Sequence, residues 1–332
     1  MKSNYRYIVK AFMAMAVIAG TTSCDDFLDR EPMSSISPET YYSTAAQLEA
    51  NLNDEYPNVL PSFGQWTYGI FGEDKGTDNQ IEVNANDRYT QDRWKVPHSE
   101  SDNWKFERIY RINFFLSEAL PKFGEDMSGS QNTISGSVAT IKHYIGEMYF
   151  LRAYEYFKKL QLFGDFPIIN QPLADEMEAL REASKRFPRN EVARFIISDL
   201  DKAYAYMSDV DMATTRINKD VAMLVKSRVA LFEATWLQNF KGTAFVPGGE
   251  GWPGASLHNN YQYPSGNIDN EVKYFLEQAV EASKLVADKY KGSLTENTGV
   301  LQQSADDPSN PYFDMFAQED LSDVKEVLLW RQ

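Results

Sequence analysis

The sequence predicts a mostly α protein, built from tetratricopeptide-like helical hairpins with long loops and few short strands. Six segments carry apolar residues at steps of three and four, the spacing of one helix face. Few segments alternate apolar and polar residues with the period of two that strands show. Loops interrupt the pattern at residues 72–97, 164–188 and 241–270. Because paired amphipathic helices bury their stripes by stacking, these observations favour an irregular helical solenoid.

The first two predicted helices flank the polar loop at residues 72–97. The first begins near Ser37-Pro38, because Ser is a preferred N-cap and Pro suits the first helical turn. The second ends at Pro121, since proline breaks a helix that it interrupts. A Ser- and Gly-rich segment, residues 127–137, is typical of a loop. The apolar faces comprise Leu48, Leu52, Tyr56 and Val59, then Phe106, Ile109, Leu116 and Leu120.

The longest periodic segment predicts a helix that ends at Gly164, a residue type favoured at C-terminal caps. Three more helices follow, and Asn218 is the expected N-cap of the second of these. His143 falls among polar positions of the longest segment, so we expect a solvated side chain. The stripes run from Ile141 through Ile145, Tyr149, Ala153, Tyr156 and Leu160 to Phe163, then over residues 192–207, 221–236 and 272–290.

The N-terminal residues carry the pattern of a secretory signal peptide. Lys2, Arg6 and Lys10 form a basic start, and the apolar segment at residues 11–20 is too short to span a bilayer. Small and polar residues then precede Cys24, the single cysteine. We therefore expect residues 1–23 to be a lipoprotein signal peptide. The alternative, a buried helix opening a cytosolic domain, does not explain the charge gradient.

Cys24 resembles the acceptor cysteine of bacterial lipoproteins, which carries acyl chains such as palmitate. The strict pattern has Leu three residues before the cysteine, where this chain has Thr21. The alternative is a free thiol without a role. With lipidation at Cys24, residues 24–37 become a lipid-anchored tether, and a stable anchor requires more than one acyl chain. A single thiol forms no internal disulfide, so the fold must rest on its core.

The composition and motifs exclude several functions. A formal charge of −15 disfavours nucleic acid as a partner. The glycines at 249–254 match a dinucleotide fingerprint only formally, because no strand precedes them and Pro253 blocks the helix. His98, His143 and His258 lack the spacing of metal ligands. No nucleophile motif occurs, and a glycosidase needs a carboxylate separation that sequence does not define. We expect no metal, no cofactor and no enzyme activity.

Five stretches of the chain follow one another in a distinctive order and spacing. They are CDDFLDREP with residues 38–42, LRAYEYFKKLQLFGDFPII (Leu151–Ile169), RNEVARFIISDLDKAYAYM (Arg189–Met207), RINKDVAMLVKSRVALFEATW (Arg216–Trp236) and PYFDMFAQEDLSDVKEVLLWRQ (Pro311–Gln332). Together they resemble the SusD/RagB family of outer-membrane nutrient-binding lipoproteins. After its mature start, the family pattern shows Arg-Ala-Tyr, aromatics, Gly-Asp and Pro, then an Ile-x-x-Asp-Leu core, an Arg-x-x-Lys-x-x-Ala helix and a late Glu-Val-Ile/Leu strand.

The resemblance implies nutrient uptake in polysaccharide utilisation. Members of the family capture an oligosaccharide or polysaccharide at the cell surface and work with a SusC-like TonB-dependent transporter. The chain would be lipid-anchored in the cell outer membrane, and the acidic residues after Cys24 resemble the signal for the outer face. Family members are considerably longer. Residues 38–332 are therefore expected to be a SusD-like helical-repeat domain, truncated at its C-terminus, with apolar stripes left uncovered.

Six aromatic residues lie outside the helical stripes, in Gly-, Pro- and Asn-rich loops. Sugars present slightly positive C–H groups that suit the negative face of an aromatic ring. Excursions of a solenoid tend to gather on one face. We therefore predict a glycan-binding platform, with the alternative that each ring only holds its own loop. The six residues are Trp66, Tyr68, Trp94, Trp252, Tyr261 and Tyr263.

Three functions compete at this point. The first is a non-enzymatic glycan-capture lipoprotein, which the loop aromatics and the lipoprotein start favour. The second is a helical-repeat protein-interaction scaffold at the cell surface, as many solenoids are. The third is a secreted carbohydrate-active enzyme, which the lack of a catalytic motif disfavours.

Overall fold

The computed structural model describes residues 41–61, 103–124, 126–208, 212–301, 303–304 and 306–331. The chain from Tyr42 onward forms one compact unit. Within the described ranges, regular secondary structure is helical, and strand pairing is limited to two isolated bridges, Thr44 with Ser135 and Phe166 with Phe187. The predicted mostly α fold is confirmed. The late strand that the family resemblance implied does not form, because residues 324–331 have no strand partner among the described residues.

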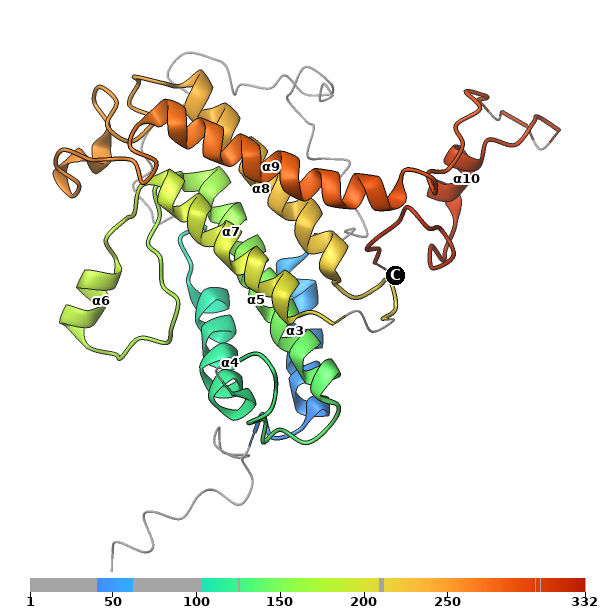
Figure 1. The fold of residues 1–332 in the computed structure, drawn as a ribbon, viewed down its shortest axis with the longest axis horizontal. Helices are drawn as coiled ribbons and strands as arrows, with labels where there is room; N and C mark the ends of the chain where they lie inside the picture. Colours follow the sequence, from blue (N-terminus) through green and yellow to red (C-terminus); the bar gives the residue numbers. More distant parts are fainter. Residues whose placement is uncertain are drawn as a thin grey trace, which may run out of the picture. The chain divides into compact units, whose positions relative to one another are not determined.

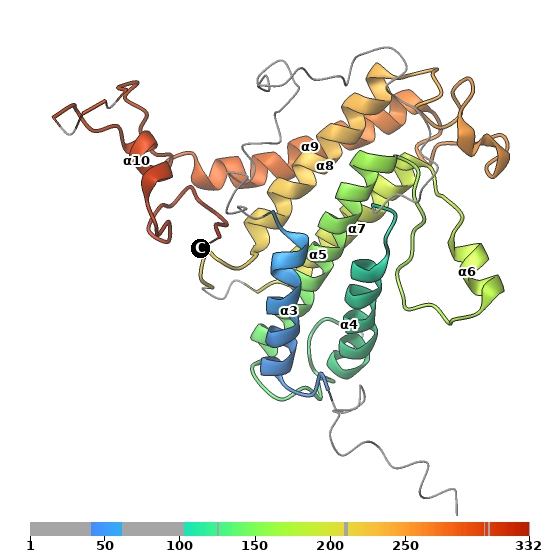
Figure 2. The same ribbon diagram turned by 180° about the vertical axis from the view of Figure 1, so that it is seen from behind.

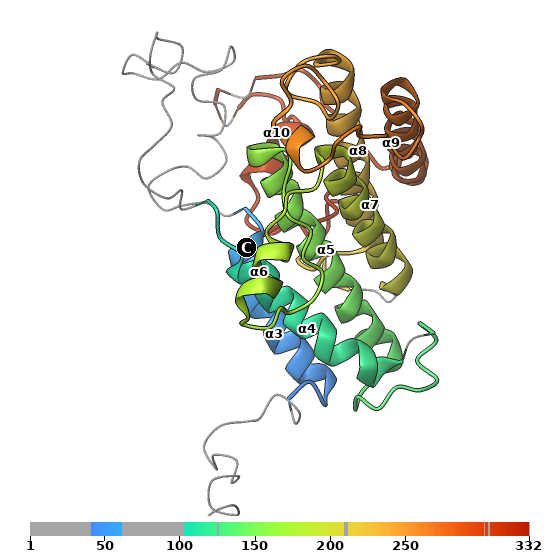
Figure 3. The ribbon, with the colours of Figure 1, turned by 90° about the vertical axis from the view of Figure 1, so that its left-hand side faces the viewer.

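In the described part of the chain, six long helices run alternately in opposite directions (Figure 1). The helix α7 packs against α5, α8 packs against α7, and α9 packs against α8. The helices α3 and α4 both pack against α5. Figure 3 shows α3 and α4 on one side of α5, with α7, α8 and α9 following on the other. The six are α3 (Ala45–Val59), α4 (Glu107–Phe123), α5 (Val138–Phe163), α7 (Arg189–Tyr206), α8 (Lys219–Asn239) and α9 (Ile268–Tyr290).

Short helices occupy the connecting segments. The helix α6 (Met177–Ala183) buries no residue and projects from the loop between α5 and α7 (Figure 2). A 3-10 helix, η3 (Pro253–Ser256), lies in the loop between α8 and α9, so the glycine-rich motif is a loop, as predicted. The helix α10 (Pro311–Ala317) follows α9. The long loops therefore carry structure of their own.

Two helix boundaries differ from the prediction. The helix α3 begins at Ala45, where Thr44 and Gln47 form a reciprocal capping box. Residues 41–44 are not helical, so the expected start at Pro38 is wrong. The helix α4 continues past Pro121 to Phe123 and is capped by Gly124, because a proline in the last turn removes only one late hydrogen bond. The predicted caps of α5 and α8 are confirmed.

The helix α5 is buried on nearly all sides, because α3, α4, α7 and α8 all contact it. Its apolar stripe is in the core as predicted, with Ile141, Ile145 and Ala153 fully buried. Its polar positions are buried too. The side chain of His143 is 1% exposed, so the expectation of a solvated histidine is wrong. A helix with neighbours on several sides needs partners for every polar side chain.

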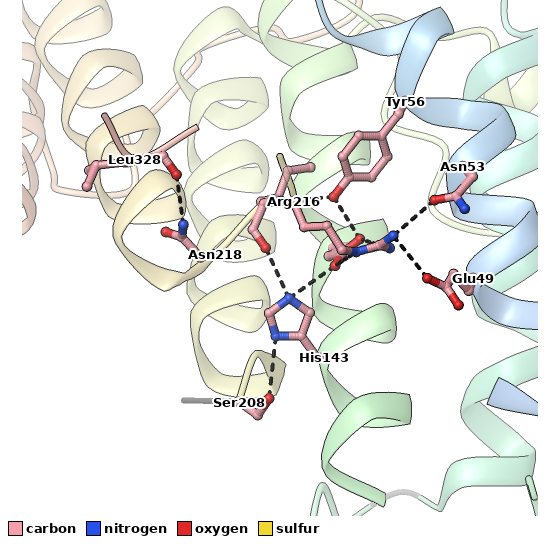
Figure 4. Close-up of polar contacts among 10 residues, drawn as sticks. Glu49, Asn53, Tyr56, His143, Ser208, Arg216, Asn218 and Leu328 are labelled. Carbon is pink, nitrogen blue, oxygen red and sulfur yellow. Dashed lines mark hydrogen bonds and ion pairs between the residues drawn. The ribbon is translucent and has the colours of Figure 1, made fainter. Parts of the chain in front are cut away.

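A polar cluster supplies these partners at one end of α5 (Figure 4). Glu147 accepts hydrogen bonds from Arg216 at 2.7 and 3.0 Å and from the Tyr56 hydroxyl at 2.8 Å. His143 Nε2 lies 3.0 Å from both Glu147 Oε1 and the Ile217 carbonyl oxygen. Burial, then the charge of Glu147, raises the pKa of Tyr56 well above its ordinary value. The cluster joins α3 and α5 to the segment that leads into α8.

A second polar cluster, centred on Arg152, ties α5 to α4 and α7. Its Nε and Nη2 donate to Asp199 of α7 at 2.7 and 2.9 Å, and its Nη1 donates to Asn113 of α4 at 2.9 Å. Nη1 also donates to the Asn170 carbonyl at 3.1 Å. Burial alone lowers the pKa of Arg152, but the hydrogen bonds and charge of Asp199 outweigh it and raise that pKa. The buried charge is therefore compensated.

An apolar face of α8 and α9 stays open to solvent. Leu224, Leu231 and Val280 are 42%, 50% and 63% exposed. With residues 326–329 they line a cavity of about 1060 Å³, here called the helix-face hollow. These exposed residues lie off the stripes predicted for the two helices, whose Val229 and Phe275 are fully buried, so the predicted stripes themselves are largely covered. Of the helices that the structure describes, none is long and apolar enough to cross a bilayer.

We expect Asp199→Asn to lower the free energy of unfolding by about 3 to 5 kcal/mol, because it leaves Arg152 charged, buried and without a counter-ion. The matched variant Asp288→Asn breaks an exposed ion pair with Lys284 on α9. It should change the same quantity by less than about 0.5 kcal/mol. Urea unfolding followed by circular dichroism measures both variants. Equal effects of the two would contradict the role assigned to the buried pair.

Candidate functional site

The described parts of the long loops meet at one end of the helical repeat. In Figure 1 the C-terminal ends of α5 and α8 and the N-terminal ends of α7 and α9 lie together at the upper left. Two hydrogen-bond contacts hold the loops there. Lys159 of α5 donates to the Asn103 carbonyl at 2.8 Å, and His258 Nε2 lies 2.8 Å from the Arg186 carbonyl oxygen. Successive helices in a solenoid reverse direction, so their connecting loops alternate between the two ends. Loop residues distant in sequence thereby become neighbours.

Asp165 links these loops through the hydrogen bonds that its carboxylate accepts. Gly164 ends α5 with a φ of 67°, a conformation that glycine adopts without strain. The chain then turns, and Asp165 Oδ1 accepts the backbone N–H of Arg189 at 2.8 Å, at the start of α7. Its Oδ2 accepts the indole N–H of Trp252 at 2.7 Å. Burial raises the pKa of Asp165, and the hydrogen bond from Trp252 opposes that shift.

An ion pair between Arg189 and Glu233 supports the same turn. The Arg189 guanidinium donates to both carboxylate oxygens of Glu233, at distances between 2.9 and 3.2 Å. The two side chains are 4% and 0% exposed. The guanidinium carbon also lies 4.1 Å from the centroid of the Trp236 ring, an arrangement favourable for a cation–π contact. Burial raises the pKa of Glu233, while the charge of Arg189 lowers it.

These elements enclose a cavity of about 650 Å³, here called the loop-end hollow. Its volume falls within the range of small-molecule sites. Phe245 is 62% exposed at its rim. Gly254 is required in its wall, because a Cβ atom there would lie 2.2 Å from the Trp252 ring. The residues that carry its chemistry are Phe163, Asp165, Arg186, Trp236, Phe245 and Trp252.

Three of the predicted aromatic residues form one ring cluster beside the hollow. The Trp252 and Tyr261 centroids are 5.6 Å apart, and those of Tyr261 and Tyr263 are 5.2 Å apart. Each polar group is engaged internally: the Tyr261 hydroxyl bonds Asn190, and the Tyr263 hydroxyl donates to the Pro247 carbonyl at 2.7 Å. The Trp252 side chain is only 5% exposed. Tyr263 therefore holds its own loop, Tyr261 ties that loop to α7, and Trp252 ties it to Asp165 and also lines the hollow.

The other predicted site residues lie outside the described residues. These are Cys24, Trp66, Tyr68 and Trp94. Their lipidation and glycan-binding roles stay predictions. No group of three or more His, Cys, Asp or Glu side chains suited to a metal ion occurs within the part of the chain that the structure describes.

Sequence reasoning missed most of the residues that build the hollow. Trp236 was assigned to a core stripe, yet it lies half-buried in the wall, with its indole N–H donating to the Phe245 carbonyl at 3.1 Å. Asp165 and Arg186 were not singled out. The Gly-Asp pair directly after the longest helix was the available signal, because such a side chain commonly satisfies free backbone groups at a chain reversal.

Comparison with known proteins places these features in a family. The family model SusD-like_3, described as "Starch-binding associating with outer membrane", matches residues 26–231. SusD-like protein P2 of Formosa agariphila is 25% identical over 253 residues, which cover 73% of this chain and 46% of that protein. SusD-like protein P25 of the same organism is also 25% identical, over 64% of this chain and 41% of its own. The chain thus spans less than half the length of these relatives.

Two solved structures match part of the chain. A SusD-like protein of Bacteroides fragilis has a TM-score of 0.44 and 21% identity, covering 64% of this chain and 40% of that one. A SusD-like carbohydrate-binding protein of Bacteroides vulgatus has a TM-score of 0.45 and 13% identity, covering 78% and 47%. Because the family model matches more than half of the residues, the chain belongs to the SusD-like family.

Proposed function

We propose that this protein is a cell-surface lipoprotein that captures oligosaccharides for uptake through a SusC-like TonB-dependent transporter of the outer membrane. The observation that carries the proposal is the loop-end hollow, whose lining combines the exposed Phe245 ring and the partly exposed Phe163 and Trp236 rings with hydrogen-bonded polar groups. Aromatic faces suit the C–H faces of sugar rings. Membership of a family described as starch-binding and associated with the outer membrane supports the same conclusion.

The hydrogen bonds of the carboxylates in and beside the hollow support capture without catalysis. A glycosidase needs two carboxyl groups that are free to act on either side of the scissile bond. Among the described residues at the hollow, Asp165 is bonded to the Arg189 N–H and to Trp252, and Glu233 is bonded to Arg189. Both groups hold the structure, so neither is available as an acid, base or nucleophile.

The remaining parts of the proposal concern the cell surface. Lipidation of Cys24 anchors the mature chain in the outer membrane, facing outward, where it meets the transporter. Trp66, Tyr68 and Trp94 remain proposed glycan-binding residues on their loop, and Trp252, Tyr261 and Tyr263 form the support of the platform. Each stacked ring contributes on the order of 1 kcal/mol, which suits capture followed by release.

One observation favours the alternative function of a protein-interaction scaffold. The helix-face hollow exposes Leu224, Leu231 and Val280 together, and contiguous apolar surface of this kind is typical of protein contacts. It lies on the faces of α8 and α9 and shares no lining residue with the loop-end hollow, although Thr235 of the first and Trp236 of the second are adjacent on α8. The two functions therefore use different surfaces and are separable by single substitutions.

We expect Phe245→Ala to weaken oligosaccharide binding by the full-length protein about fivefold, because it removes one exposed ring from the rim of the loop-end hollow. Phe313→Ala on α10 is the matched control, since Phe313 is 50% exposed and does not line that hollow. Isothermal titration calorimetry against a glycan selected on an array gives both affinities. Unchanged binding by Phe245→Ala, or an equal loss in both variants, would place the ligand elsewhere.

We expect Trp252→Phe to loosen the wall of the hollow while keeping an aromatic ring there. The substitution removes the N–H that bonds Asp165, at a cost of about 1 to 2 kcal/mol in local stability. Amide hydrogen exchange should become faster at residues 244–257, and glycan affinity should fall. Trp330→Phe removes a similar bond, from the indole to the Thr214 hydroxyl at 2.9 Å, and should leave both quantities as in the parent. Unaltered hydrogen exchange in Trp252→Phe would contradict the claim that the hydrogen bond to Asp165 holds this loop in place.

We expect the mature protein to fractionate with membranes and Cys24→Ser to remain soluble or unprocessed, because the thiol is the proposed site of acylation. Ser35→Ala, a small change within the tether, is the control and should stay in the membrane fraction. Immunoblots of separated membrane and soluble fractions measure the outcome. Equal membrane retention of the two variants would exclude Cys24 as the anchor.

A further inference from the structure

Arg186 is held in place at the loop-end hollow by its neighbours. Its guanidinium carbon lies 4.6 Å from the centroid of the Trp104 ring. Its carbonyl oxygen lies 2.8 Å from His258 Nε2. The next residue, Phe187, exchanges two backbone hydrogen bonds with Phe166, at 3.0 and 3.2 Å. The backbone is therefore fixed, and the side chain lies against a flat aromatic surface.

The surface beneath Arg186 is itself rigid. The Trp104 ring packs edge-on against Phe163 and Phe166, with centroid distances of 4.9 and 5.0 Å. Stacking engages the flat face of a guanidinium and leaves the N–H groups in its plane free to donate. A preorganised guanidinium loses little conformational entropy when it binds a ligand.

The other charged groups that line the hollow are already paired. Asp165 accepts two hydrogen bonds, and Arg189 is bound by both oxygens of Glu233. Among the described residues, Arg186 forms no ion pair, although it lines the hollow and is exposed to solvent. The chain as a whole carries a formal charge of −15. Within the part of the chain that the structure describes, Arg186 is thus a cation without an ion-pair partner, although its charge acts to lower the pKa of Asp165, which lines the same hollow.

We propose that the loop-end hollow selects sugars that carry an anionic group, a uronate carboxylate or a sulfate, and that Arg186 is the residue that binds it. The inference rests on the proposed glycan-binding function and adds the class of glycan. The planar guanidinium fork matches the paired oxygens of a carboxylate or sulfate, and such charge-assisted bonds are about twice as strong as neutral ones. Phe245 and Trp236 then cover the sugar ring beside it.

The test compares sugars that differ only in charge. Full-length protein is titrated in a calorimeter with oligogalacturonides and their methyl esters, and with carrageenan oligosaccharides and their desulfated forms. In at least one pair, the anionic member should bind about tenfold more tightly than its neutral partner. The pair that shows the preference identifies the group as carboxylate or sulfate.

Substitutions at two arginines of the same loop assign the preference. Arg186→Gln should bring the ratio of anionic to neutral affinity close to one, and Arg186→Lys, which keeps the charge without the fork, should give an intermediate ratio. Arg181→Gln is the matched control, because Arg181 is exposed on α6 and paired with Glu178. It should leave the ratio as in the parent.

The outcomes separate this inference from the function on which it rests. Binding of neutral and anionic partners with equal affinity, or a preference that survives Arg186→Gln, would overturn the role of Arg186 and leave glycan capture intact. Absence of binding to every oligosaccharide in the two pairs and on the array would overturn both.

Discussion

The burial of α5 is the constraint on which the rest of the repeat depends. Four helices contact it, so side chains on almost every side of α5 lose access to water. Unpaired polar groups in such a place cost several kcal/mol each, and α5 carries several. Arg152 is compensated by Asp199 and Asn113, and Glu147 by Arg216 and Tyr56. These partners come from α3, α4, α7 and the segment before α8, so the same hydrogen bonds that permit the burial also align the neighbouring helices.

The position of the C-terminal end of α5 also determines where the connecting loops lie. Because the helix is fixed, the turn at Gly164 places Asp165 at one position relative to the start of α7. The carboxylate then holds Trp252, in a loop that begins only after α8. Binding residues carried on loops need such rigid support. The loop-end hollow is therefore an extension of the packing of α5 into the connecting segments.

The loop-end hollow and the helix-face hollow differ in the chemistry of the side chains that line them. Among the described residues at the loop-end hollow, the charged groups are paired except for Arg186, and the lining aromatic rings pack on neighbouring rings behind them, such as Trp236 on Phe240 and Trp252 on Tyr261. At the helix-face hollow the exposed side chains of α8 and α9 include the aliphatic Leu224, Leu231 and Val280. The first arrangement suits a small polar ligand that leaves again, whereas the second suits apolar contact with another polypeptide surface. The proposed glycan site follows from this difference in chemistry.

The sequence by itself determined the helices, most of their ends, and the family. The three- and four-residue spacing identified one apolar face of each helix, and local caps such as Asn218 and Gly164 marked the ends. Periodicity is local, so it could not reveal how many neighbours a helix has, and His143 was wrongly expected in solvent. The loop aromatics were visible, but the burial of Trp252 depends on Asp165, 87 residues away. Only the tertiary structure decided which rings hold the loop and which line the hollow, because that depends on contacts between distant segments.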